Sequence, residues 1–251
     1  MSPLADSAGV PFEGRQFHEN PGAGDDGTAP PMVLEAIRRF RAREVGGPEV
    51  VAALHGARLL VPLVAVRGDE GVGAQGQLVD KTQELSIVTV EGPDGRAVLP
   101  AFTSVAAMQA WDGSARPIPI EASRVALAAA SEGTPLVVVD PGSETEFVVR
   151  RPALRALATG EPWRPSFEDP AVLAAVQASA EAHPEIVAVG LGPGDPDARL
   201  SGPELMVGLG LQPGLDADAL GAIVREVQQR WSIDPVIAER VDSIGVRVHP
   251  S

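Results

Sequence analysis

A proline-rich break divides this sequence into two stretches, each with its own apolar periodicity. Residues 161–170 (EPWRPSFEDP) hold three prolines and show no apolar period. Each proline fixes φ and lacks a backbone N–H, so neither a helix nor a central strand is expected to run through them. The break predicts two small domains, at residues 31–160 and 171–251, with a linker at 161–170. At 251 residues the chain is long enough to give both domains a core.

Residues 1–30 are predicted to form a disordered tail. Gly, Pro and Asp dominate the end of this segment (NPGAGDDGTAPP), and no apolar period begins before Pro31. Such a segment buries too little apolar surface to offset the entropy lost on ordering.

Composition excludes several classes of function. The chain contains no cysteine, which rules out disulfides, thiolate metal sites and cysteine nucleophiles within it. Its formal net charge of −14 argues against binding to nucleic acid or anionic membranes, because phosphate groups attract Lys and Arg. No run approaches the roughly 18–20 apolar residues of a membrane span, and the first residues lack the regions of a signal peptide. We therefore expect a cytoplasmic protein without membrane contact.

Helical patterns recur through the first domain. Val33, Ile37 and Phe40 fall on one face of a helix predicted over residues 31–45. Helices are likewise expected at residues 48–56, 104–111, 123–133 and 152–160.

Strand patterns with strong turn signals alternate with these helices. Pro-Asp-Gly at residues 93–95 lies between two strand patterns and predicts a β-hairpin over residues 84–102. In the strand pattern at 57–66, Pro62 cannot donate to a ladder, which predicts an edge strand or a bulge. A second hairpin is expected at 134–150, and an extended segment at 117–122.

The second domain shows the order αββαβ. Its predicted elements are helices at 171–182 and 217–231 and strands at 185–191, 204–211 and 235–248, the last as one bent strand or two short ones. This order resembles a truncated ferredoxin-like arrangement, an antiparallel sheet covered by two helices. The chain is therefore assigned to the α+β class, with two small domains, each a mixed or mostly antiparallel sheet covered by helices.

Phe102, Thr103 and Ser104 stand where a predicted strand meets a predicted helix. A serine nucleophile needs a general base and oxyanion donors, but the turn lacks the glycines of a G-x-S-x-G elbow. None of the four histidines sits in a motif that suggests a base. We expect Thr103 or Ser104 to cap the helix that ends near Trp111, with Phe102 packing beneath it. A ligand contact and a nucleophile are the alternatives for this turn.

The segment LPAFTSVAAMQAW resembles the N-terminal domain of the SseB family, bacterial proteins named for a serine-sensitivity phenotype. The ARLLVPL strand and the segment VVVDPGSETEFVV support the resemblance, which spans roughly residues 31–160. Residues 171–251 resemble, more weakly, the C-terminal domain that some members carry. The resemblance implies a cytoplasmic α+β protein with no established catalytic residue, so no functional residue is carried over.

The glycine-rich segment 190–202 is predicted to be a hairpin connection. A phosphate loop opens a helix, whereas prolines and a strand follow here. Asp195 and Asp197 could contact a cation, but the later glutamate of a calcium loop is missing. We expect no catalytic residue, no cofactor and no metal site.

Arg38, Arg39, Arg41 and Arg43 form a basic run in an otherwise acidic chain. The run could dock an acidic partner or RNA, although a solvated helix face is the usual outcome. Trp163 lies in the linker and is expected to seal the two domains together or to mark a partner surface. Trp111 and Trp231 are expected to anchor a core or the domain seam.

These features favour a noncatalytic binding or regulatory protein that acts through protein–protein contacts. The expected partner is another protein, nucleic acid is disfavoured, and a homo-oligomer could form through a sheet edge. The alternative is a small-molecule sensor, for instance of an amino acid, or an enzyme, with its site in the domain seam.

Overall fold

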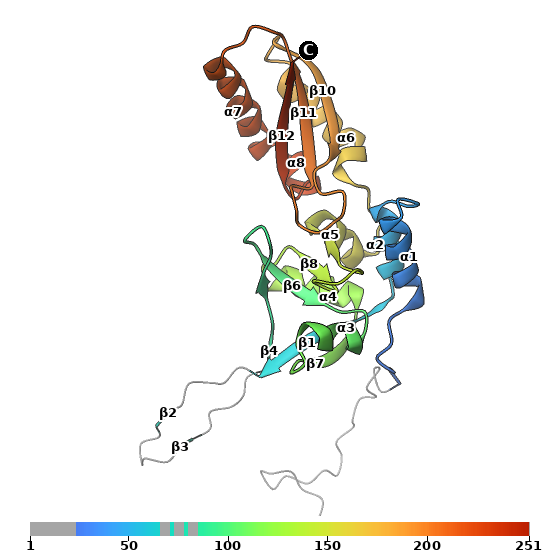
Figure 1. Cartoon of the computed structure of the whole chain (residues 1–251). Coiled ribbons are helices and arrows are strands. Elements are labelled where there is room, and N and C mark those ends of the chain that lie inside the picture. Colours follow the sequence, from blue (N-terminus) through green and yellow to red (C-terminus); the bar gives the residue numbers. More distant parts are fainter. Residues whose placement is uncertain (1–23, 66–70, 73–77, 80–84, 251) are drawn as a thin grey trace, which may run out of the picture.

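The structure, a computed structural model, describes residues 24–65, 71–72, 78–79 and 85–250. Its elements gather into an N-terminal unit (residues 24–160) and a C-terminal unit (residues 170–250), which lie one above the other in Figure 1. Each unit has its own hydrophobic core. Residues 161–165 between them have no regular structure, and the 3-10 turn η1 (Ser166–Glu168) follows. Helices combined with mixed and antiparallel sheets confirm the α+β class.

The N-terminal unit contains two sheets that meet at one bridge. The first has the order β5 (Val90–Glu91), β6 (Ala97–Ala101), β8 (Val137–Val139), β9 (Phe147–Val149), with β6 and β8 parallel and the outer pairs antiparallel. The second is antiparallel, with the order β4 (Leu85–Ile87), β1 (Arg58–Ala65), β7 (Arg116–Glu121). Backbone hydrogen bonds between Leu60 and Phe102 connect β1 to the end of β6. A short antiparallel pair, β2 (Gly71–Val72) and β3 (Leu78–Val79), lies between β1 and β4 in the chain.

Both predicted hairpins are confirmed, because β5 pairs with β6 and β8 with β9. The first strand of the earlier hairpin is divided in two, since β4 pairs with β1 and only β5 pairs with β6.

Pro62 lies in the central strand of its sheet, so the predicted edge position is wrong. It stands directly opposite Pro117 of β7. Leu60 directs its N–H to Phe102, and alternate residues of a strand direct their N–H groups to the same side. The nitrogen of Pro62 therefore faces the gap between Phe102 and the first β4 partner, Ile87. Proline is tolerated there because the ladder is interrupted on that side.

Helices cover the N-terminal sheets with their apolar faces. α1 (Pro31–Arg41) buries Val33, Ile37 and Phe40, the face that their spacing predicts. The other predicted helices are confirmed as α2 (Gly47–Leu54), α3 (Val105–Trp111), α4 (Ala122–Ser131) and α5 (Arg151–Thr159). α5 ends at Gly160, whose φ of 80° is the left-handed conformation that glycine adopts without strain.

Residues 24–30, predicted as part of a disordered tail, are held against the N-terminal unit. The Arg58 guanidinium donates to Asp25 at 2.8 Å and to the Thr28 carbonyl at 2.6 Å. The Val105 N–H donates to the Gly27 carbonyl at 2.9 Å. These contacts contradict the tail prediction for residues 24–30, whereas residues 1–23 lie outside the described residues.

The C-terminal unit is a sheet with helices packed against it. The strand order is β10 (Ile186–Pro193), β11 (Leu205–Leu211), β12 (Ile244–Pro250), with β10 antiparallel and β12 parallel to β11. The predicted helices are confirmed as α6 (Pro170–Ala180) and α7 (Ala217–Ile233). Trp231 of α7 is buried and donates its Nε1–H to Ser179 of α6 at 2.6 Å. The ferredoxin-like arrangement is not confirmed, because such a sheet is antiparallel whereas β12 runs parallel to its neighbour.

Residues 235–240 form a helix, α8 (Pro235–Arg240), where a strand was predicted. The Asp234 carboxylate accepts the N–H groups of Val236 and Ile237 at 2.8 Å and 3.0 Å. Asp followed by Pro is a helix-start signal, and here it outweighs the apolar residues that suggested a strand. The last strand begins only at Ile244.

Candidate functional site

Phe102 and Ser104 form a packing and capping junction. Ser104 Oγ accepts the N–H of Ala107 at 3.1 Å, so the predicted cap of α3 is confirmed. Phe102 is fully buried and contacts Trp111 with ring centroids 5.3 Å apart. Thr103 has a different role, since its N–H and its hydroxyl each donate to the carboxylate of Asp140 at 2.7 Å.

Asp140 is a buried residue that the sequence did not single out. It adopts a φ of 47° at the turn after β8 and also accepts the Thr145 hydroxyl at 2.8 Å. Asp beside Pro-Gly is typical of turns, which is the one signal that the sequence offered. Because Asp140 receives both donors of Thr103, this pair stabilises the junction between β6, β8 and α3.

Replacing Ser104 by alanine is expected to lower the free energy of unfolding by about 1 kcal/mol, the usual value of a helix N-cap. The reason is that the Ala107 N–H loses its acceptor while the packing of Phe102 is unchanged. Urea denaturation followed by circular dichroism measures the difference. A Ser104→Thr variant, which keeps a capping hydroxyl, is the matched control and should recover most of the loss.

The arginines of the basic run divide into two pairs. Arg38 and Arg39 are exposed and form surface ion pairs with nearby glutamates. Arg41 and Arg43 instead contact the β10–β11 connection of the C-terminal unit. Arg41 donates to the Asp197 carbonyl, and Arg43 pairs with the Asp197 carboxylate at 2.5 Å. Two of the four arginines of the basic run therefore connect the two units.

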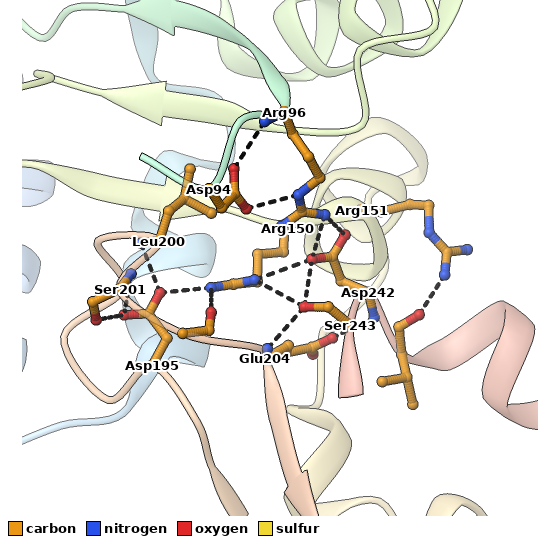
Figure 2. Close-up of polar contacts among 12 residues, drawn as sticks. Asp94, Arg96, Arg150, Arg151, Asp195, Leu200, Ser201, Glu204, Asp242 and Ser243 are labelled. Carbon is orange, nitrogen blue, oxygen red and sulfur yellow. Dashed lines mark hydrogen bonds and ion pairs between the residues drawn. The ribbon is translucent and has the colours of Figure 1, made fainter. Parts of the chain in front are cut away.

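Arg150 connects the two units through a buried ion-pair network (Figure 2). Its guanidinium donates to Asp195 at 2.6 Å, to Asp242 at 3.1 Å and to the Gly202 carbonyl at 2.8 Å. The side chains of Arg150, Asp195 and Asp242 are 7%, 1% and 2% exposed. Asp242 also pairs with Arg96 of the β5–β6 turn at 3.0 Å. Charges buried this deeply are costly to desolvate, so each needs its partner.

Asp195, a possible cation ligand by its sequence position, accepts hydrogen bonds from protein donors instead. Besides Arg150, the Ser201 hydroxyl donates to it at 2.7 Å. Burial acts to raise the pKa of Asp195, but the hydrogen bonds from Ser201, Arg150 and the Arg199 N–H outweigh it and hold that pKa below its usual range. Within the residues that the structure describes, no three His, Asp or Glu side chains gather as a metal site.

A cavity of about 440 Å³ lies at the seam, the contact region between the two units. Its walls include the aromatic rings of Phe40, Phe147, Trp163 and Phe167 and the charged groups of Arg43, Arg150, Asp195 and Glu204. The structure thus places Trp163 and Arg43 together at the seam, away from the exposed Arg38 and Arg39. Apolar walls with a few convergent polar groups are the usual form of a small-molecule site.

Two residues of the seam cavity wall, Trp163 and Glu204, each hold a polar atom, Nε1 and Oε1, that is buried without a hydrogen-bond partner among the described residues. The other oxygen of Glu204 accepts the Asp242 N–H at 2.5 Å, and the Ser166 hydroxyl approaches the carboxyl without the geometry of a hydrogen bond. Burial raises the pKa of Glu204 above its usual value. An unsatisfied buried polar group costs about 1–3 kcal/mol, which makes these two atoms the strongest indication of a ligand.

Comparison with known proteins identifies the N-terminal unit. In the described part of the chain, no helix has both the length and the apolar composition needed to cross a membrane. No curated protein and no solved structure gives a significant match. Residues 33–156 match the family model described as SseB protein N-terminal domain. This match covers both N-terminal sheets, the Phe102–Ser104 junction and Arg150, and through it the N-terminal unit belongs to the SseB family.

Proposed function

We propose that this chain is a noncatalytic binding protein whose binding site is the seam cavity. The observation that carries the proposal is a pair of polar atoms, Trp163 Nε1 and Glu204 Oε1, that are buried without a hydrogen-bond partner in the described residues and belong to residues of the cavity wall. A bound molecule that contacts both atoms would replace the water that they lose on folding. The Thr103–Asp140 pair supports a noncatalytic role, because each donor of Thr103 is held by a buried carboxylate.

The position of the cavity between the two units supports a regulatory role for a molecule bound there. Its walls come from α1 and β9 on one side and from the β10–β11 connection and Glu204 on the other. A molecule bound there contacts both units, so its binding free energy can change how they dock. We propose that a cytoplasmic protein partner responds to this change, and not RNA, because Arg41 and Arg43 are engaged within the chain.

A small molecule bound in the seam cavity is expected to raise the melting temperature. At 100 times its dissociation constant, a ligand stabilises the folded state by about 2.7 kcal/mol, which corresponds to a shift of roughly 5–10 °C for a chain of this size. Differential scanning fluorimetry of the purified chain against a chemically diverse panel of small molecules makes the measurement.

Two tryptophan variants locate the binding site. Trp163→Leu removes a wall of the cavity, and Trp111→Leu removes a half-buried tryptophan that packs on Phe102. We expect the ligand-induced shift to be lost in the first variant and kept in the second. If no compound of the panel stabilises the chain, or if both variants keep the shift, the seam cavity is not the binding site.

Pull-down from a native lysate tests the regulatory part separately. A stoichiometric protein partner, retained differently when a stabilising compound is present, is the expected result. Identical retention with and without the compound would contradict coupling between the cavity and the partner.

A further inference from the structure

The charged groups of the seam cavity wall are paired except at Glu204. Arg43 pairs with Asp197 at 2.5 Å, and Arg150 pairs with Asp195 and Asp242. Every cationic group of the cavity wall is thus matched by at least one carboxylate within the protein. Glu204 forms no ion pair with any Arg or His of the described residues. Glu204 is therefore the carboxyl of the cavity wall that has no cationic partner in the described residues.

The Glu204 carboxyl is fixed in place. Glu204 is 7% exposed, and its backbone N–H donates to Ser243 Oγ at 3.0 Å. One carboxyl oxygen accepts the Asp242 N–H, while the other is buried without a partner in the described residues. A carboxyl held in this way needs either a proton or an external cation.

The rest of the cavity wall suits the body of an organic cation. Phe40 and Phe147 contact edge to face with centroids 5.2 Å apart, and Trp163 lies in the same wall. Aromatic faces attract ammonium groups as well as apolar ligands. The unpartnered Trp163 N–H adds a donor, so the same molecule needs a hydrogen-bond acceptor.

We infer that the seam cavity binds a primary amine that carries an apolar body and a hydrogen-bond acceptor. This inference rests on the proposed function and names the chemical class of the ligand. The ammonium group pairs with Glu204 Oε1, the acceptor receives the Trp163 N–H, and the apolar body lies among the aromatic rings. The net charge of −14 favours the approach of a cation over that of an anion.

Four compounds of similar size separate the contributions of these groups. L-phenylalanine amide has the ammonium, the carbonyl and the ring. 3-Phenylpropanamide lacks the ammonium, phenethylamine lacks the carbonyl, and 3-phenylpropionate replaces the cation by an anion. Isothermal titration calorimetry with the full-length chain should find the amide of phenylalanine the tightest. Loss of the ammonium should weaken binding by about tenfold or more, because a hydrogen bond to a charged group is the stronger kind.

Glu204→Gln removes the charge and keeps the shape of the side chain. We expect this variant to bind L-phenylalanine amide about tenfold or more weakly, and to bind 3-phenylpropanamide as the native chain does. Its fold is expected to be intact. Because burial raises the pKa of Glu204, the native chain loses stability as pH rises from the unfolded pKa of this carboxyl through its folded pKa. The variant avoids that loss and should melt no lower than the native chain at neutral pH.

The pH dependence of binding supplies a second measurement. The charged groups that face Glu204 are Arg150 and Asp242, and both are committed to the buried network. A proton and an ammonium group compete for the same carboxyl, so affinity for phenethylamine, whose alkylammonium stays charged well above neutral pH, should rise as pH rises through the pKa of Glu204 and then level off until the amine itself deprotonates. The same titration with Glu204→Gln should be flat over that range.

Trp163→Phe completes the set by removing the N–H while keeping a ring. In this variant L-phenylalanine amide and phenethylamine should bind with equal affinity, because the acceptor has lost its donor. Tight binding of 3-phenylpropanamide or 3-phenylpropionate, unchanged in Glu204→Gln, would overturn the amine inference and leave the seam cavity as a binding site. Failure of all four compounds to bind the native chain overturns the inference about the amine. The fluorimetry screen of the wider panel then tests separately whether the seam cavity binds any small molecule.

Discussion

Replacing Arg150 by alanine is expected to lower the free energy of unfolding by about 3–5 kcal/mol, the usual cost of removing one partner from a buried ion pair. The variant leaves Asp195 and Asp242 buried without the guanidinium that lies between them (Figure 2), with side chains that are 1% and 2% exposed. In the variant Asp242 still forms its ion pair with Arg96, whereas Asp195 has no arginine side chain left to pair with. Urea denaturation followed by tryptophan fluorescence and by circular dichroism measures the effect.

Arg155→Ala is the matched control. Arg155 also connects the two units, through an ion pair with Glu239 at 2.5 Å, but the two side chains are 62% and 52% exposed. Water screens such a pair, so we expect a loss of about 0–1 kcal/mol. If Arg150→Ala costs no more than Arg155→Ala, the Arg150 network does not stabilise the seam.

The loss of folding stability at acidic pH provides a second test of the Arg150 network. The folded-state pKa of Asp195 lies below its usual value, so its contribution to stability is present above the unfolded pKa of about 3.9 and is lost as pH falls through the folded pKa. In Arg150→Ala one of the interactions that lower this pKa is gone. The variant should therefore lose less additional stability between neutral and acidic pH than the native chain.

The fold could be predicted from the sequence where the signal is local. Val33, Ile37 and Phe40 repeat at helical spacing and are buried together in α1. Pro-Asp-Gly sets the turn between β5 and β6. The misassigned segment, 235–240, is too short for its period to separate strand from helix, and the capping geometry of Asp234 decides it.

The seam could not be predicted because its residues are isolated in the sequence. Arg150 is 45 residues from Asp195 and 92 from Asp242, so no spacing rule connects them. Glu204 stands at the head of an apolar strand pattern, a position that is usually solvated, yet in the fold it is 7% exposed. Trp163 carried the one usable signal, an aromatic residue in a proline-rich linker.

Parallel pairing of β12 with β11 was missed for a related reason. A strand–helix–strand segment usually joins parallel neighbours, but the αββαβ order does not say which strand lies next to the last one. The unpredicted α8 takes up residues 235–240 before β12 begins. The chain then enters the sheet at Ile244, opposite Leu205, and runs parallel to β11.

The Phe102–Ser104 junction yields the other large effect, because Phe102→Ala is expected to cost about 3–5 kcal/mol, as truncation of a buried aromatic side chain does. Phe102 is 0% exposed and packs in a small cluster with Leu60, Met108 and Ala115, beside Trp111. Its backbone hydrogen bonds to Leu60 survive the change, so the loss measures packing and the cavity left behind. Urea denaturation followed by tryptophan fluorescence gives the magnitude.

Phe102→Leu is the matched control for this substitution, since it keeps an apolar side chain in the same cluster and should recover part of the loss. Ligand stabilisation through the seam cavity should persist in both variants, because Phe102 and Ser104 do not line it. Should Phe102→Ala cost no more than Ser104→Ala, Phe102 would not anchor a core. The motif that carries the family resemblance and the cavity that is expected to bind a ligand are thus different parts of the molecule, and these substitutions separate stability from binding.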